Sequence, residues 1–419
     1  MKILFLTDYW FPKKTANAVC VQNIAKELLA SGNEVYVCAY KEADNSPAEE
    51  DGLHFSYVRP SLARRLMHTS AQCQNAALAK TLGMIGVAIN RIRRFLLLPF
   101  YPLVSLAFPH RWQRAAEKII RREKIDVLVS VIAPEEALYT GYLTKKRNPG
   151  VEWIIYYIDA GTNILPGTSF ERVKRTLQKK ASRWENRLFR KADKVIVMEG
   201  HANYYRQNLT PQNLPKLRVA NVPMLKRPSN TPTQETGEKA GVEKWVYTGN
   251  MQGTLYDPRS LCELFIEYAR ARQAELHLYG PSDHDSYLSE IQEKNRNIFW
   301  HGSKPHEEVV LAQKNADVLV YFITRELDSV SGKLFEYLAH RKPIVFLGPE
   351  NDINVRQLSK FRLGLPLSIA QSSTANATCV NHFLSNIPQN VDIPWTEIET
   401  NYWRCLPRTT ADIITDNQR

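Results

Sequence analysis

The sequence has no long hydrophobic run and no clustered cysteines. None of the uncharged stretches in its 419 residues reaches the roughly 20 residues that a helix needs to cross a bilayer. The six cysteines form no C-x-x-C pair and no Cys/His cluster, which argues against a zinc site and fits reduced thiols. The opening stretch, MKILFLTDYWF, reads as a strand and lacks the cleavage region of a signal peptide. We therefore expect a cytoplasmic, globular protein.

Several catalytic signatures are also missing. The sequence contains no G-x-G-x-x-G, no Walker loop and no nucleophilic serine or cysteine elbow. The enzyme classes that depend on these motifs are therefore not indicated.

Positive charge is concentrated in the first half of the chain. Through Leu225 there are 34 Lys and Arg against 19 Asp and Glu, a net +15, whereas the remainder has 21 against 24, a net −3. Such asymmetry suggests an anionic partner for the first half, either nucleic acid or a membrane surface, or else a solvated basic surface. Because no nucleic-acid-binding module is recognisable, we expect no nucleic acid and favour an anionic membrane surface.

Strand and helix patterns alternate along both halves. KILFLTDYW, the helical stretch AVCVQNIAKELLASG that ends at Gly32, and EVYVCAY make a β-α-β unit. Later strands are expected at 126–132, 153–159 and 194–199. A polar stretch at 226–244 with two prolines and two glycines reads as a linker. The pattern then restarts with five strand candidates: WVYTGN, ELHLYG, IFWHG, DVLVYF and PIVFLG.

These patterns predict an α/β protein made of two Rossmann-like domains that face a cleft. The predicted parts are an N-terminal domain at 1–225, the linker at 226–244, a second domain at 245–395, and a tail at 396–419 that could pack back on the first domain. Ligands of open parallel sheets bind beyond the carboxyl ends of the strands. The loops that follow strands are therefore the candidate sites.

The stretch SVSGKLFEYLAHRKPIVF, residues 329–346, has a phosphate-binding pattern. Ser331, Gly332 and Lys333 would place backbone N–H groups and the positive end of a helix dipole beside an anion. Lys333, Glu336 and His340 fall three and four residues apart, so they share one polar helix face. The alternative is that Lys333 and Glu336 form only a solvated ion pair.

The same stretch resembles the E-x7-E signature of retaining glycosyltransferases of the GT-B fold, family 4, with Asp328 and Glu336 as its two carboxylates. SGKLFEYLAHRKPIV is similar to the form found in bacterial surface-polysaccharide members. The opening MKILFLTDYWFPKKTANAVCVQNIAKELLASGNEVYV is similar to the opening of that family, and WVYTGN and IFWHG stand where the family has its linker-following and base-contacting strands. The resemblance covers most of the chain.

The resemblance implies transfer of a sugar from a nucleotide-sugar donor to a glycan or lipid-linked acceptor at the inner face of a bacterial membrane. It implies no metal and no further cofactor. Glu336 would accept hydrogen bonds from the donor ribose and Asp328 would bind the transferred sugar. Ser331, Gly332 and Lys333 would hold the diphosphate, with Lys333 also neutralising the departing group.

The resemblance implies further contacts in both domains. Gly249 and Asn250 of YTGN belong to the donor-binding set, and Gly302 would edge the nucleobase. From the first domain, Thr15, Ala16 and Asn17 would close over the diphosphate. Asp159 is the best candidate for an acceptor-side base or a carboxylate that positions the sugar, although a strand-end aspartate also serves as a turn or helix cap.

Some positions depart from the family pattern. The opening loop, KKTANA, has no glycine, and Asp328 is one methylene shorter than the usual glutamate. The Arg and Lys that often follow YTGN are replaced by MQGTLYDPRS, where Arg259 is the nearest cation. Asp283 and Asp285 match the D-x-D of metal-dependent glycosyltransferases, but they follow LYGPS and are interpreted as a turn. A nucleotide-sugar-binding protein without transfer activity, and a sugar-nucleotide epimerase, therefore stay as alternatives.

Residues 91–114, RIRRFLLLPFYPLVSLAFPHRWQR, contain fourteen uncharged residues between arginine-rich flanks. The stretch is too short and too broken by proline to span a bilayer, but it suits the membrane interface. The alternative is an ordinary buried hairpin of the first domain.

Overall fold

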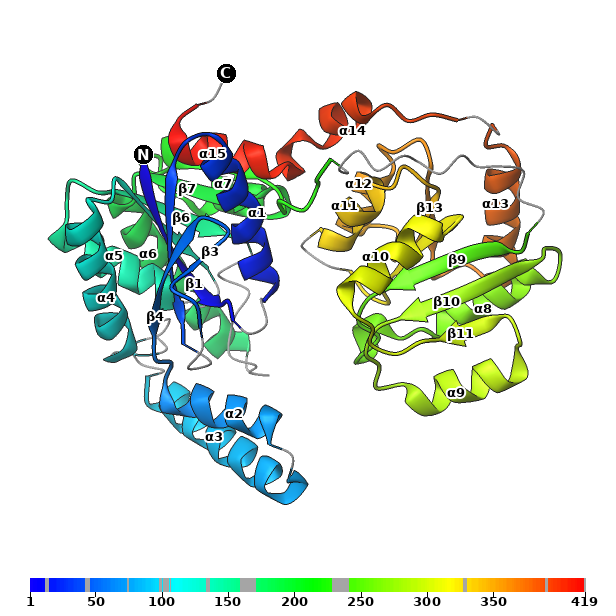
Figure 1. Cartoon of the computed structure of the whole chain (residues 1–419), viewed down its shortest axis with the longest axis horizontal. Helices are drawn as coiled ribbons and strands as arrows, with labels where there is room; N and C mark the ends of the chain where they lie inside the picture. Colours follow the sequence, from blue (N-terminus) through cyan, green and yellow to red (C-terminus); the bar gives the residue numbers. More distant parts are fainter. Residues whose placement is uncertain are drawn as a thin grey trace. The chain divides into compact units, whose positions relative to one another are not determined.

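The chain divides into two compact units. Unit 1 comprises Met1–Pro223 and Pro407–Arg419, and unit 2 comprises Met224–Leu406. The predicted tail at 396–419 contributes to both units, and most of the predicted linker at 226–244 lies outside the described residues. The computed structural model (Figure 1) describes residues 1–11, 15–41, 46–73, 75–97, 100, 105, 107–132, 136–158, 171–227, 241–326, 330–388 and 391–417.

Within these described residues, unit 1 is built on an eight-stranded sheet of order β3-β4-β2-β1-β5-β6-β7-β8. β3 pairs antiparallel with β4, and the other neighbours are parallel. Its strands are β1 (Lys2–Tyr9), β2 (Glu34–Tyr40), β3 (Glu49–Glu50), β4 (Leu53–Val58), β5 (Val127–Val131), β6 (Glu152–Tyr157), β7 (Lys194–Met198) and β8 (Leu217–Ala220). Its helices are α1 (Ala16–Ala30), α2 (Leu62–Gln72), α3 (Ala76–Leu97), α4 (Ala107–Glu123), α5 (Glu136–Arg147), α6 (Glu171–Lys191), α7 (Ala202–Asn208) and α15 (Pro407–Thr415), with short 3-10 turns at Glu199–His201 and Leu214–Lys216.

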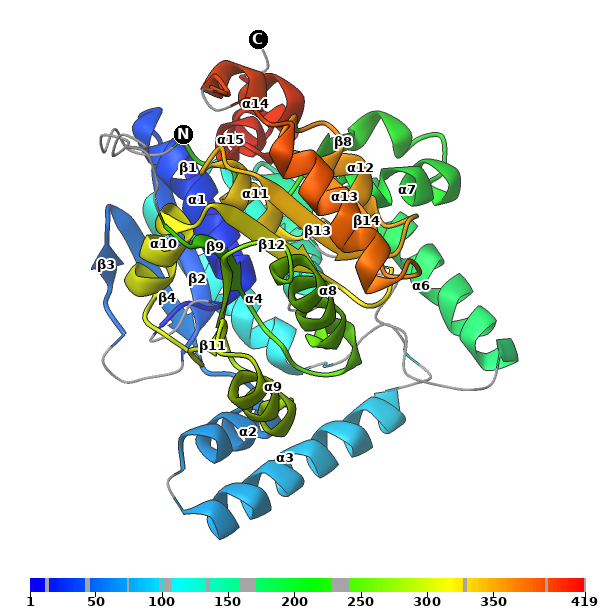
Figure 2. The same ribbon diagram turned by 90° about the vertical axis from the view of Figure 1, so that its right-hand side faces the viewer.

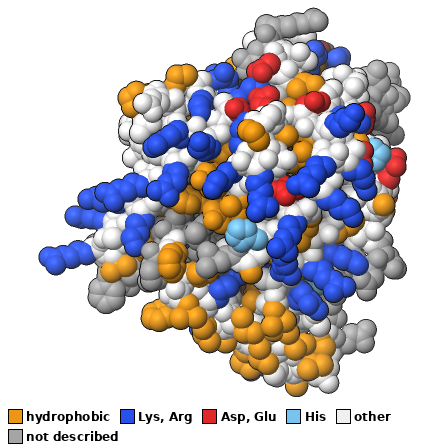
Figure 3. Space-filling view, turned by 90° about the vertical axis from the view of Figure 1, so that its left-hand side faces the viewer, with side chains coloured by type: hydrophobic (Ala, Val, Ile, Leu, Met, Phe, Trp, Pro, Cys, Tyr) orange, Lys and Arg blue, Asp and Glu red, His pale blue; other side chains and the backbone are white. Residues whose placement is uncertain are grey.

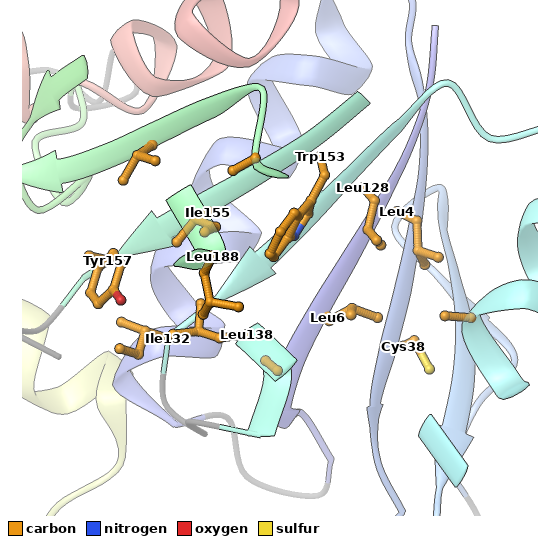
Figure 4. Packing of buried hydrophobic residues seen from close by; sticks show 14 of the residues in the cluster. Leu4, Leu6, Cys38, Leu128, Ile132, Leu138, Trp153, Ile155, Tyr157 and Leu188 are labelled. Atoms are coloured by element: carbon orange, nitrogen blue, oxygen red, sulfur yellow. The ribbon is translucent and has the colours of Figure 1, made fainter. Parts of the chain in front are cut away.

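The central strands of unit 1 are apolar on both faces because helices cover both. Successive side chains of a strand point to opposite faces, so Leu4 and Leu6 of β1 face one layer while Ile3 and Phe5 face the other. Figure 4 shows Leu4, Leu6, Leu128, Trp153 and neighbouring side chains packed into one continuous buried layer. The apolar residues that predicted each of these strands are therefore the ones that pack against the helices on the two faces of the sheet.

The end of the chain packs back on unit 1. α15 lies beside α1 and contacts β8. The ammonium group of Lys194, at the start of β7, donates to the Ile414 carbonyl at 3.4 Å and lies 2.8 Å from the Asp416 carboxylate. The last helix is therefore a structural part of the first sheet, although it follows the whole of unit 2 in the sequence.

Unit 2 has a six-stranded parallel sheet, counted over the residues described above, of order β11-β10-β9-β12-β13-β14. Figure 2 shows α8 and α13 side by side on one face of it. Its strands are β9 (Glu243–Thr248), β10 (Ala274–Tyr279), β11 (Ile298–Trp300), β12 (Val318–Phe322), β13 (Ile344–Gly348) and β14 (Gly364–Ser368). Its helices are α8 (Arg259–Ala269), α9 (Asp285–Lys294), α10 (His306–Asn315), α11 (Gly332–Leu338), α12 (Ile353–Leu358), α13 (Ser373–Ser385) and α14 (Trp395–Tyr402), with 3-10 turns at Thr254–Tyr256 and Trp403–Cys405.

Candidate functional site

The predicted phosphate-binding stretch forms the start of α11 in unit 2. Ser331 is extended and caps the helix, and its hydroxyl accepts from the Lys333 amide at 3.3 Å. The Ser331 amide in turn donates to the side chain of Asn354 at 2.9 Å. Two of the three backbone amides expected to face an anion therefore already have protein partners. The Lys333 ammonium becomes the main cationic group at this end of α11.

The side chain of Lys333 crosses to the loop after β9. A Cβ added at Gly249 would lie 2.2 Å from Lys333 Cε and 2.7 Å from its Nζ. Two predicted site residues that are far apart in the sequence are thus in contact. Only glycine at position 249 leaves room for Lys333 in this position.

Glycines line the carboxyl ends of three neighbouring strands. The Gly249 amide donates to the Tyr279 carbonyl at 2.7 Å, and the Gly280 amide donates to the Gly302 carbonyl at 2.8 Å. Gly280 has φ +138°, and a Cβ there would lie 1.7 Å from the Gly249 carbonyl oxygen. The backbones of these loops therefore approach more closely than side chains would allow. Gly280 was not among the predicted site residues, although its place after the ELHLY strand is a recognisable signal.

Lys333 and Glu336 are both half-buried on α11. Burial lowers the pKa of the Lys333 ammonium, opposed by the charge of Glu336. Burial likewise raises the pKa of the Glu336 carboxyl, opposed by Lys333, His306 and Lys226. Burial thus disfavours the charged form of both side chains, and the charge of each one partly offsets this effect on the other.

The Glu336 carboxylate makes no hydrogen bond and no ion pair with any residue that the structure describes. The solvated Lys333–Glu336 ion pair considered from the sequence does not form. A buried carboxylate without donors is costly, so Glu336 is available to accept hydrogen bonds from the hydroxyl groups of a ligand.

A buried hydrogen-bond network holds α11 against β9 and α10. The Tyr337 hydroxyl accepts from the Thr248 amide at 2.9 Å and lies 3.1 Å from the Thr248 hydroxyl. The Thr248 hydroxyl also accepts from Gln313 Nε2 at 2.8 Å, and Gln313 Oε1 lies 3.1 Å from His340 Nε2. Burial, with Lys342 and Lys314 nearby, lowers the pKa of His340 to about 4. His340 is therefore neutral at pH 7 and acts as a structural donor, not as a charged member of the polar face.

Other predicted residues of unit 2 lie near these groups. The Asn250 carbonyl accepts from the Tyr247 hydroxyl at 2.8 Å. His301 precedes Gly302 and stacks on Tyr279 with ring centroids 4.3 Å apart. Gly302 has φ +66°, so it too favours glycine.

Arg259 and Asp283 make local contacts. Arg259 forms an ion pair with Asp257 at 2.9 Å and lies over the Tyr287 ring. Asp283 accepts from the amide of Gly253, in the loop after β9, at 2.8 Å, and Asp285 is the first residue of α9.

In the part of the chain that the structure describes, no group of three or more His, Cys, Asp or Glu side chains is placed to hold a metal ion.

In unit 1, the predicted residues lie at the start of α1. Thr15 caps the helix: its hydroxyl accepts from the Ala18 amide at 3.1 Å and donates to Asp8 Oδ1 at 2.7 Å. Ala16 and Asn17 are the first two helical residues. Burial raises the pKa of Asp8 to about 6, while the Thr15 hydrogen bond acts in the opposite direction. Asp8 was missed from the sequence, although a carboxylate near the end of an apolar strand was a visible signal.

Two predicted carboxylates, Asp159 and Asp328, lie outside the described residues. Lys333, Gly249, Ser331, Gly332 and Glu336 are gathered in one part of unit 2, whereas the Thr15 group belongs to unit 1.

No family model and no curated protein sequence matches the chain. Solved structures do match it over its whole length. The lipopolysaccharide outer core galactosyltransferase WaaB, in its apo form, has a TM-score of 0.57 at 12% identity, covering 100% of both chains. WaaG, a glycosyltransferase involved in lipopolysaccharide biosynthesis, has a TM-score of 0.54 at 12% identity, covering 99% of this chain and 100% of that one. The α,α-trehalose 6-phosphate synthase of Burkholderia multivorans has a TM-score of 0.56 at 11% identity, covering 99% and 96%.

Such low identities carry information about the fold alone. The two mainly parallel sheets and the full-length matches agree with the α/β fold that the sequence predicts. The chain has the GT-B fold of glycosyltransferases.

Proposed function

We propose that the protein is a retaining glycosyltransferase that moves a sugar from a nucleotide-sugar donor to a glycan or lipid-linked acceptor. We place this reaction in bacterial cell-surface polysaccharide synthesis, at the inner face of the membrane. The observation that carries the proposal is the pairing on α11 of a lysine packed against Gly249 with a half-buried carboxylate that has no partner among the described residues. A nucleoside diphosphate offers both the anion and the hydroxyl groups that these two side chains need.

The geometry of unit 2 supports a role for each donor-binding residue. The Lys333 ammonium would bind the diphosphate, with Ser331 and Gly332 forming the helix start beside it. Glu336 lies one helical turn further on and would accept from the ribose hydroxyls. Gly249 and Asn250 would border the diphosphate. Gly302, beside the stacked rings of Tyr279 and His301, would border the nucleobase.

The proposal also gives roles to residues of unit 1 and to the two remaining carboxylates. Thr15, Ala16 and Asn17 would approach the diphosphate from the start of α1, where the helix dipole favours an anion. Asp328 would bind the transferred sugar, and Asp159 would be the carboxylate that positions the sugar. Neither of these two carboxylates lies within the described residues, so their roles rest on the family resemblance alone.

The proposed transfer breaks the bond between the anomeric carbon and the diphosphate oxygen and forms a bond from that carbon to the acceptor oxygen. The acceptor proton ends on the departing diphosphate, so the step needs no protein base. Lys333 stabilises the negative charge that develops on the leaving group, and this contribution grows in the transition state, where that charge forms.

The test is incubation of the purified full-length protein with UDP-, GDP- and dTDP-sugars. We expect slow release of the nucleoside diphosphate from one donor class, with the anomeric configuration retained when an acceptor is supplied. Interconversion of the sugar without release would instead indicate an epimerase. If the protein binds a donor but neither releases the nucleoside diphosphate nor interconverts the sugar, with every acceptor preparation tried, it is a binding protein without transfer activity. A protein that binds none of these donors would overturn the proposal.

A further inference from the structure

The helices α2 and α3 form a hairpin that projects from the sheet of unit 1 (Figure 1). The two helices pack closely through glycines of α3. A Cβ added at Gly86 would lie 2.8 Å from Met67 Cγ, and a Cβ at Gly83 would lie 2.8 Å from the Ser70 hydroxyl. These contacts fix which side of α3 faces α2.

Another side of α3 exposes large apolar side chains. Leu78, Ile85 and Ile92 follow one another at intervals of seven residues, which places them on one stripe of the helix. The stripe continues into Phe95 and Leu96, which are 75% and 65% exposed. We call these five residues the apolar stripe: Leu78, Ile85, Ile92, Phe95 and Leu96.

Exposed apolar residues are concentrated in this hairpin. Of the sixteen large hydrophobic side chains that are exposed among the described residues, nine lie between Leu62 and Phe100. Figure 3 shows hydrophobic side chains gathered at the end of the molecule where Figure 1 places α2 and α3, with lysine and arginine side chains above them. Single exposed apolar residues are common on proteins, but a gathered set of this size marks a surface that binds something.

The charge of the region is entirely positive. Between Asp51 and Glu117 the sequence contains nine Lys and Arg and no Asp or Glu. Lys80, Arg91 and Arg94 are exposed on α3, and none of them forms an ion pair with another described residue. Arg91 directly precedes Ile92 and Arg94 directly precedes Phe95, so free cations border the apolar stripe.

The base of the hairpin is fixed to the body of unit 1. Arg64 of α2 forms an ion pair with the buried Glu136 at 3.0 Å, and its guanidinium lies 4.9 Å from the centre of the Tyr40 ring. Phe108, in contrast, is buried under the sheet at 2% exposure. The segment at 91–114 is therefore divided: its start belongs to the exposed helix α3, and its end belongs to the core.

We propose that the α2–α3 hairpin docks on an anionic phospholipid bilayer, laying the apolar stripe in the interface and its arginines against the headgroups. This inference extends the proposed function, since it names the element that would bring the protein to a membrane-bound acceptor. No helix among the described residues is long and apolar enough to cross a membrane, so the hairpin would lie on the bilayer. A second copy of the chain fits this surface less well, because two such surfaces would bring unpaired positive charges together.

The test is flotation of the full-length protein with vesicles of phosphatidylcholine, with and without phosphatidylglycerol. We expect the protein to float with the anionic vesicles and to stay behind with phosphatidylcholine alone. Replacing three stripe residues (Ile92→Ser, Phe95→Ser, Leu96→Ser) should weaken partitioning by roughly tenfold or more, since each removes apolar area from the interface. The pair Arg91→Glu and Arg94→Glu should weaken it similarly, and high salt should do the same to the wild type.

Two control variants test whether a loss of flotation is specific to the hairpin or follows from any change in net charge or exposed apolar area. Arg183→Glu with Arg187→Glu makes the same change in net charge on exposed positions of α6 and should float like the wild type. Leu311→Ser removes a comparably exposed leucine from α10 and should also float. Circular dichroism and thermal melting should show that every variant is folded.

Several outcomes would overturn the proposal. These are a wild type that does not float, stripe variants that float as well as the wild type, flotation only when the vesicles contain a polyprenyl phosphate, and a dimer in sedimentation that Phe95→Ser dissociates. Flotation requires no nucleotide sugar, and Glu336→Gln should float normally. A failure here therefore leaves the donor-site proposal untouched, and loss of donor binding leaves the docking proposal untouched.

Discussion

The Lys333 side chain occupies the space beside Gly249 that any larger residue at position 249 would need. The two are separated by more than eighty residues in the sequence, yet a Cβ at Gly249 would lie 2.2 Å from Lys333 Cε. The contact joins the loop after β9 to the start of α11. The absence of a side chain at residue 249 therefore allows the Lys333 ammonium to take this position.

Gly249→Ala is expected to weaken donor binding while leaving the fold nearly intact. The added methyl group meets the flexible end of Lys333, which can move away, and also lies 2.8 Å from the hydroxyl of the buried Tyr247, so we expect a modest cost in stability beside the effect on Lys333. A displaced ammonium loses a charge-assisted contact to the diphosphate, worth about 2 kcal/mol, so the dissociation constant should rise roughly tenfold to hundredfold. Calorimetric titration with the active nucleotide sugar measures this effect.

Gly241→Ala is the matched control, because a Cβ at that position meets nothing within 4 Å. It should bind donor like the wild type. Equal affinity of the Gly249→Ala variant and the wild type would show that Lys333 does not bind the donor from its observed position.

Gly280→Ala is expected to destabilise unit 2 strongly. Its φ of +138° is rarely adopted by other residues, and its Cβ would collide with the Gly249 carbonyl oxygen, which belongs to backbone and cannot swing away. We expect a loss of about 3 to 5 kcal/mol in the free energy of unfolding, measured with denaturant. Gly253→Ala also has positive φ, at +64°, but its Cβ meets no atom within 4 Å. With a ψ of −175° it also lies in a region that only glycine adopts readily, so it should cost about 1 to 3 kcal/mol. A loss as large as that of Gly280→Ala would contradict the predicted collision.

Local sequence signals predicted the elements that hold the site better than they predicted the contacts within it. The apolar runs indicated the central strands, and the Ser-Gly-Lys stretch indicated the start of a helix where α11 begins. Local patterns suffice there because burial on both faces of a parallel sheet and helix capping depend on neighbouring residues.

The contacts that could not be predicted from the sequence are those between segments that are far apart in the chain. The approach of Gly280 to the Gly249 carbonyl depends on how two neighbouring strands end, and the partners of Tyr337 come from β9 and α10. Part of the exposed stripe of α3 was also missed: Ile92, Phe95 and Leu96 fall in the stretch at 91–114 that the sequence marked as interfacial, but Leu78 and Ile85 do not. Spacing alone does not show which face of a helix stays uncovered.

Asp8→Asn is expected to change how stability depends on pH. Burial raises the pKa of Asp8 from 3.8 to about 6, so the folded state favours the protonated carboxyl. The resulting stabilisation is complete below about pH 4 and is lost as the pH rises through about 6. Asparagine stays neutral and can still accept from the Thr15 hydroxyl, so it should be more stable than the wild type by about 2 to 3 kcal/mol at neutral pH and show no advantage near pH 4.

Unfolding free energies across this range would test the prediction. Glu185 also has a raised pKa, about 8, but it is present in both proteins and cancels in their difference. A constant difference between Asp8→Asn and the wild type from about pH 4 to pH 7 would refute the assignment of a raised pKa to Asp8.

Glu336→Gln is expected to reduce turnover strongly without harming the fold. The carboxylate is half-buried and has no partner among the described residues, and burial raises its pKa, so the free protein gains little from the charge. The protonated carboxyl of the wild type therefore contributes to the stability of the fold at low pH, and this contribution is lost as the pH rises above the ordinary glutamate value of about 4.5. At pH 7 the Glu336→Gln variant, whose amide stays neutral, should be at least as stable as the wild type. Donor turnover should fall about a hundredfold or more, because glutamine offers the ribose hydroxyls one weaker acceptor in place of a charged one. Glu293→Gln makes the same chemical change at an exposed position of α9 and should leave turnover unchanged, whereas full activity in Glu336→Gln would remove the ribose contact from the proposed mechanism.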